Sequence, residues 1–133
     1  MIIVVDTNII IAALIKNSIS RKILLDKEIN FICPEESLIE IKNHKAEIQE
    51  KAILSNEEFE IVLSIIFENI TIISKEEYIQ LIPETISLID DKKDVPFLAL
   101  AIAKKADYIW SEDEHFIKQN KVKILKTKDL LFF

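Results

Sequence analysis

Short apolar runs rich in β-branched residues alternate with longer helical segments along this chain, and the alternation limits the folds that it can adopt. The first run, Ile2 to Val5, is apolar at every position, as expected of a strand buried on both faces in a parallel sheet. The pattern predicts an α/β fold, a three-layer α/β/α sandwich with a central, mostly parallel sheet of four to five strands. The expected strands cover residues 2–5, 30–34, 70–74, 107–111 and 122–125.

The segments between these runs carry apolar residues at helical spacing. A helix is expected to begin near Thr7, and one long helix is expected over residues 34–54, with Pro34 in its first turn. A helix with a break at Pro83 follows the third strand. Ser111 and Glu114 have the spacing of a capping box, which predicts the start of a short helix over 112–119. Further helices are expected over 19–25, 56–69 and 95–106.

The composition indicates one compact domain and removes several classes of protein. With 133 residues, 50% of them hydrophobic, the chain has the size and composition of a single domain, residues 1–133. It contains no glycine, which excludes the glycine-rich phosphate loops of many nucleotide-binding proteins. The single cysteine, Cys33, can form neither an internal disulfide nor a thiolate zinc site, which favours a reducing cytoplasm. The apolar stretch 2–15 is interrupted by Asp6 and Asn8 and is too short to span a bilayer, so no membrane partner is expected.

The charge is unevenly distributed along the chain. A formal net charge of -6 argues against a nucleic-acid partner, because phosphate binding normally requires a basic surface. The segment from Lys118 to Lys128 is nevertheless rich in lysine, so one face of the protein could differ in sign from the rest. An ordinary solvated surface is the alternative interpretation.

Three aspartates are expected to meet at one edge of the sheet. Asp6 ends the first predicted strand, Asp113 follows the fourth, and Asp94 precedes the helix that leads into the fourth. In open parallel sheets, ligands bind at the carboxyl edge of the strands. Carboxylates that lie together repel one another and require a cation, and oxygen ligands suit Mg²⁺ or Mn²⁺. Such ions promote hydrolysis of phosphodiesters.

Each of these residues also has a simpler interpretation. Ser and Asp are common at helix N-termini, and acids in a first helical turn interact favourably with the helix dipole. Asp94, two residues before Pro96, could therefore be only a helix cap, and the same holds for the acids after Ser111.

The motifs "VVDTN" and "KDVPFLALAIAKKADYIWSEDEHF", in this order, make the chain resemble the PIN-domain ribonucleases from Ile2 to about Leu125. The resemblance implies a parallel α/β/α sandwich that binds Mg²⁺ or Mn²⁺ through acidic residues and cleaves single-stranded RNA as an endonuclease. It also implies an assembly, because such proteins are often homodimers and often toxins that pair with an antitoxin.

Matched residue by residue, the resemblance implies a catalytic and metal-binding set formed by Asp6, Glu40, Asp94 and Asp113. Helical spacing does not support Glu40 independently, since it lies away from the apolar stripe of its helix, and a solvated surface glutamate is the alternative. Asn8 is expected to orient Asp6. The hydroxyl of Ser111 is expected to hold Asp113 or a metal-bound water.

Two further residues near the last aspartate carry weaker expectations. Glu112 replaces the small residue that the family often has there, and we interpret it as pairing with a helix dipole. His115 is interpreted as a residue on the helix surface, because the metal already supplies the hydroxide that a general base would generate.

Two other functions compete with the nuclease hypothesis. A binding or interaction protein on a degenerate PIN fold would use the acids only as helix caps. An aspartyl phosphatase of the haloacid-dehalogenase type also begins with an aspartate after its first strand, but it needs a second aspartate two residues later, where this chain has Asn8.

Overall fold

The computed structural model describes residues 1–133 except for the side chain of Ile117, and it contains a sheet of five parallel strands. The strands are β1 (Ile2–Val5), β2 (Asn30–Pro34), β3 (Ile70–Ile73), β4 (Tyr108–Trp110) and β5 (Lys123–Leu125), and their order is β3-β2-β1-β4-β5. The predicted parallel α/β architecture is confirmed. Because β1 lies in the middle, between β2 and β4, the switch in strand order falls at its carboxyl end.

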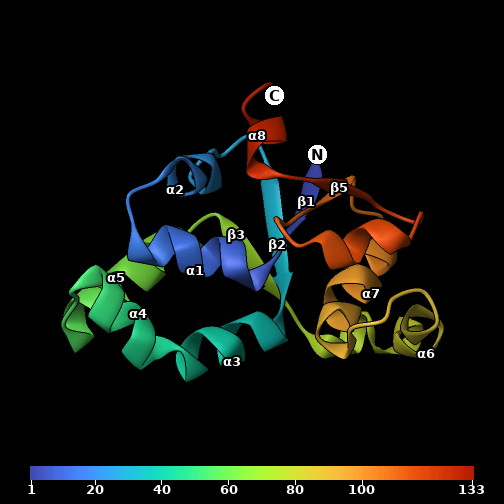
Figure 1. Ribbon diagram of the computed structural model, residues 1–133, viewed down its shortest axis with the longest axis horizontal. Helices are drawn as coiled ribbons and strands as arrows, with labels where there is room; N and C mark the ends of the chain where they lie inside the picture. The colour runs from blue at the N-terminus through green and yellow to red at the C-terminus, as the bar shows by residue number, and fades with distance from the viewer.

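Helices cover both faces of the sheet (Figure 1). Alternate side chains of β1 enter different cores, with Ile3 and Val5 on one face and Val4 on the other. The helices are α1 (Thr7–Ile15), α2 (Ile19–Leu24), α3 (Glu35–Asn43), α4 (Lys45–Ala52), α5 (Asn56–Phe67), α6 (Ile82–Ile86), α7 (Val95–Ala103) and α8 (Thr127–Leu130). Single-turn 3₁₀ helices lie at η1 (Lys75–Glu77), η2 (Ile79–Leu81), η3 (Lys92–Asp94) and η4 (Glu114–Lys118).

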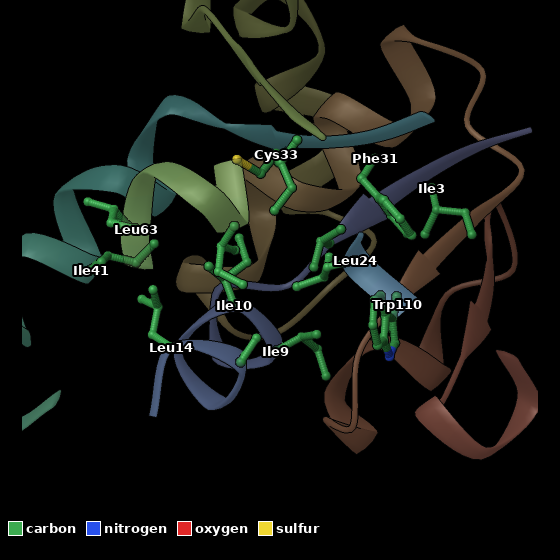
Figure 2. Packing of buried hydrophobic residues seen from close by; sticks show 14 of the residues in the cluster. Ile3, Ile9, Ile10, Leu14, Leu24, Phe31, Cys33, Ile41, Leu63 and Trp110 are labelled. Atoms are coloured by element: carbon green, nitrogen blue, oxygen red, sulfur yellow. The ribbon is translucent and has the colours of Figure 1, made fainter. Parts of the chain in front are cut away.

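The larger core lies between the sheet and the helices that follow β1 and β2. It joins Ile10 and Leu14 of α1 and Phe59 of α5 to Phe31 and Trp110 of the sheet. Figure 2 shows side chains of this cluster gathered around α1 and the strands. The smaller core, on the opposite face, is built around α7, whose residues from Val95 to Ala101 are nearly all buried. Among the described residues, no helix is long and apolar enough to cross a membrane.

The predicted long helix over 34–54 is wrong, because the structure divides it into α3 and α4 at His44. The Nδ1 atom of His44 lies 2.8 Å from the carbonyl oxygen of Glu40. The same carbonyl also accepts from the N–H of His44 at 3.1 Å, so the last helical bond of α3 is kept and α3 ends at this residue. The bend brings Ile48 of α4 into the larger core.

The segment between β3 and α7 also differs from its prediction. Pro83 does not break a helix but lies in the first turn of α6, a position where its missing N–H costs nothing. The residues before it form η1 and η2. Without glycine, the left-handed backbone conformation falls to Ile53, at the end of α4, and to Lys105, after α7.

Candidate metal centre

Asp6 and Ser111 lie side by side at the carboxyl edge of the two central strands. Asp6 follows β1 directly, and its N–H donates to the carbonyl of Trp110 across the sheet at 3.0 Å. The Ser111 hydroxyl, fully buried, donates to Oδ2 of Asp6 at 2.7 Å. Burial raises the pKa of Asp6, with a contribution from nearby Asp113, although the Ser111 hydrogen bond and the backbone N–H of Asn8 oppose the change.

Asp113 approaches the same site through Ser111. Its N–H donates to the Ser111 oxygen at 2.9 Å, so one hydroxyl connects the two acids. The predicted capping box between Ser111 and Glu114 is not formed. Asp113 caps η4 instead, accepting from the N–H of His115, and Glu114 pairs with Lys126.

Asp94 occupies the N-cap position of α7, but among the described residues its side chain receives no hydrogen bond from that helix. Its Oδ2 atom is buried and has no hydrogen-bond partner in the part of the chain that the structure describes. Burial raises the pKa of Asp94 to about 6, with further contributions from Asp113, Asp91 and Asp6. An acid that makes no cap bond and lies in the field of three other carboxylates does not fit the simple cap interpretation.

Glu40, from α3, lies near Asp6. Burial and then the carboxylate of Asp6 raise the pKa of Glu40, and the hydroxyl of Thr7 lowers it in part. Thr7 itself donates to Ser37 of α3 at 2.9 Å, and both residues are buried, so this bond attaches α3 to the start of α1. Glu40, away from the apolar stripe of its helix, is thus close to one of the three aspartates, Asp6.

Two predicted supporting residues have roles of different kinds. Asn8 is exposed, and it acts on Asp6 through its backbone N–H, while the described atoms include no side-chain hydrogen bond from Asn8 to Asp6. Glu112 accepts a hydrogen bond from the N–H of Thr127 at 2.8 Å, so it caps the start of α8 rather than joining the acids.

The approach of Asp91 and His115 to the acids was not predicted from the sequence. Asp91 and His115 offer ligand atoms that, with one from Asp94, all lie within 4.8 Å of one another. His115 is therefore not only a surface residue, although its side chain is 61% exposed. The run of acids and lysines before Asp94 was the available signal, but it has no period that indicates where Asp91 points.

The lysine-rich segment is partly neutralised. Lys118 lies 2.6 Å from Asp90, and Lys126 lies 2.6 Å from Glu114. Because Asp90 and Glu114 neutralise these two lysines, the segment presents less positive charge to a phosphate than its lysine content suggests.

The chemistry of the donor set fits a divalent cation. Asp6, Asp94, Asp113 and Glu40 supply only oxygen atoms, which Mg²⁺ and Mn²⁺ prefer. Oδ2 of Asp94 is buried without a hydrogen-bond partner among the described residues. Burying an unpaired charge costs on the order of several kcal/mol, so this oxygen requires either a proton or a cation.

Comparison with known protein families identifies the chain. The family described as PIN domain matches residues 4–132. The chain belongs to the PIN-domain family. These domains are nucleases. A search of curated proteins gives no match.

A solved structure supports the PIN fold. One chain of VapBC2 from Rickettsia felis, crystallised with a DNA fragment from its promoter, aligns with a TM-score of 0.71. The two chains are 20% identical, and the alignment covers 95% of this PIN domain and 98% of the other chain. At this level of identity, the likeness concerns the fold.

Replacing Ser111 by alanine should weaken both the centre and the fold. The variant leaves Oδ2 of Asp6 and the N–H of Asp113 without their common partner, which should cost about 1–3 kcal/mol of the free energy of unfolding. Affinity for Mn²⁺ should fall by about tenfold, since the hydroxyl orients a ligand. Denaturant unfolding and calorimetric titration measure the two effects. An unchanged affinity would show that Ser111 does not position Asp6.

Proposed function

We propose that this PIN domain is a metal-dependent endoribonuclease that hydrolyses phosphodiester bonds of single-stranded RNA with Mg²⁺ or Mn²⁺. The observation that carries the proposal is the buried, unpartnered Oδ2 of Asp94, whose carboxyl shares one electrostatic environment with Asp6 and Asp113. The preference for single-stranded RNA follows from the family resemblance.

In this proposal the residues have distinct tasks. Asp6, Asp94 and Asp113 hold the cation, and Glu40 adds a fourth carboxylate. Ser111 keeps one oxygen of Asp6 in a fixed orientation while it anchors the backbone of Asp113. A divalent ion held by these residues would supply positive charge to the phosphate and would lower the pKa of water toward neutral. The shared field of the acids provides the binding energy for that ion.

We also propose that the protein acts as the toxin of a toxin–antitoxin pair, as a homodimer in the cytoplasm. The fold shared with a chain of VapBC2 supports this assignment. Exposed isoleucines on the helices after β2, namely Ile39, Ile61 and Ile65, offer apolar surface for a second chain. The buried free thiol of Cys33 suits a reducing compartment.

The purified protein should cleave a fluorescent single-stranded RNA in the presence of Mg²⁺ or Mn²⁺ and stop completely in excess chelator, because the carboxylates alone supply no nucleophile. Activity should return when Mn²⁺ is added above the chelator concentration. The assay should include a duplex RNA and a single-stranded DNA of the same sequence to test the substrate preference. Cleavage that persists in the chelator would contradict the mechanism, and a protein that binds no metal would favour the degenerate PIN-fold alternative.

A further inference from the structure

Beside the proposed centre, the ring of His115 faces acids from two different turns. Its Nδ1 atom lies 3.2 Å from Oδ1 of Asp113, 3.6 Å from Oδ2 of Asp91 and 3.8 Å from Oδ2 of Asp94. These separations resemble those between neighbouring ligands of one ion, since a metal about 2.1 Å from each ligand sets adjacent ligands about 3 Å apart. The ring is thus on the edge of the acidic cluster and not directed into solvent alone.

The oxygen of Asp94 in this group is the unpartnered one. The side chain of Asp94 is 10% exposed, and Oδ2 has no hydrogen-bond partner among the described residues. Exposed acidic groups often lie together without an ion. A buried carboxylate oxygen that points at a nitrogen and a second carboxylate, without a hydrogen bond of its own, indicates a position for a cation.

Asp91 is held in place for this contact. Its Oδ1 accepts a hydrogen bond from the N–H of Lys93 at 3.0 Å, and this bond fixes the carboxylate at the start of η3. Oδ2 is then the atom closer to His115. A cavity of about 260 Å³ opens beside the pair, and its lining is Asp90, Asp91, His115 and Lys118. It gives a hydrated ion access to the side of the centre.

We propose that Asp91 Oδ2 and His115 Nδ1 join Asp94 Oδ2 in binding a divalent transition-metal ion, and that the nitrogen ligand makes this centre prefer Mn²⁺ to Mg²⁺. Mg²⁺ is bound almost entirely by oxygen and retains its waters, whereas imidazole suits transition metals. The inference rests on the proposed metal-dependent function, because Asp94 serves both sets of ligands.

The experiment compares His115→Gln with the wild type in the full chain, with Asp91→Asn as a second variant. Glutamine removes the imidazole nitrogen and offers an amide, whose nitrogen has no free lone pair for a metal. Because the side chain of His115 is 61% exposed, the variant should keep the fold. His44→Gln is the matched control, since the chain contains 2 histidines and His44 is exposed at the junction of α3 and α4. Asp90→Asn is the control for loss of one charge beside Asp91.

The first measurement is direct and requires no nuclease activity. The pulsed electron paramagnetic resonance spectrum of Mn²⁺ bound to the wild type should show modulation from a ¹⁴N nucleus. The modulation should disappear in His115→Gln and persist in His44→Gln. Bound Mn²⁺ without ¹⁴N modulation in the wild type would overturn the inference and leave His115 as an ion-pair partner of the acids.

The second measurement is the pair of dissociation constants for Mn²⁺ and Mg²⁺, from calorimetric titration and competition. The wild type should prefer Mn²⁺. In His115→Gln, affinity for Mn²⁺ should fall by about tenfold with little change for Mg²⁺. Asp91→Asn should weaken Mn²⁺ binding, and Asp90→Asn should not. If the ratio of the Mn²⁺ and Mg²⁺ dissociation constants is the same in the wild type and in His115→Gln, this inference is contradicted and the proposed function is not. If the wild type binds neither ion, the proposed function is contradicted as well.

Discussion

Replacing Asp6 by asparagine is expected to reduce RNA cleavage by at least about a thousandfold, with the fold retained. Asp6 lies at the carboxyl end of the central strand, and its Oδ2 accepts the hydrogen bond from the Ser111 hydroxyl. Asparagine has the same shape and can still accept the Ser111 hydroxyl bond, but it lacks the charge that a cation requires. The loss should therefore appear in the catalytic rate and in metal affinity, not in the far-ultraviolet circular dichroism spectrum.

The matched control is Asp26→Asn, which removes the same charge in the loop before β2. This variant should cleave RNA at the wild-type rate, because Asp26 lies at the opposite, amino edge of the sheet. Both proteins should be assayed at saturating Mn²⁺ with a single-stranded RNA. An Asp6→Asn variant that retains more than about a tenth of the activity would exclude Asp6 as a metal ligand, since a ligand carboxylate is required throughout the reaction.

Replacing Asp94 by asparagine is expected to stabilise the metal-free protein at pH 7.5 by on the order of 2 kcal/mol. The pKa of Asp94 is about 6 in the folded protein, against an ordinary value of 3.8, because burial and then Asp113, Asp91 and Asp6 disfavour its charge. The folded state therefore favours the protonated form. The contribution of Asp94 to stability is fully present below about pH 4 and is lost as the pH rises through 6. Asparagine, which does not ionise, avoids this loss.

The difference between variant and wild type should thus be small at pH 4 and grow toward pH 7, as measured by thermal or denaturant unfolding without metal. Mn²⁺ should reverse the order of stability. At a hundred times its dissociation constant, the ion should stabilise the wild type by about 2.7 kcal/mol, a gain that the variant should largely lose. Identical metal-induced shifts in the melting temperatures of the two proteins would assign Asp94 to a structural role.

The strands and the edge of the sheet were predictable from the sequence because both depend on simple repeating rules. Continuous β-branched runs locate β1 and β2, and an aspartate directly after a buried strand, such as Asp6, must emerge at the carboxyl edge. Glu40 could be assigned only through the family resemblance, since its orientation depends on how α3 is attached through Thr7 and Ser37.

The remaining features depend on interactions that leave no periodic pattern in the sequence. The break between α3 and α4 at His44 lies in a segment that has neither glycine nor an internal proline, so no residue type in the sequence indicates it. Asp91 and His115 approach each other because the short turns η3 and η4 fold toward the same edge. One-turn helices are set by local hydrogen bonds and tertiary packing, so the sequence did not predict this pair.

The strand order has a consequence for synthesis. The central strand β1 is made first, yet β4, which completes its hydrogen bonding, follows after about a hundred residues, and the bond between Ser111 and Asp6 spans 105 positions. Contacts of such long range form slowly, because the chain must close a large loop before it gains their energy. A nascent chain still held by the ribosome within β4 lacks both Ser111 and Asp113. The proposed metal centre can therefore assemble only after nearly the whole domain has been synthesised.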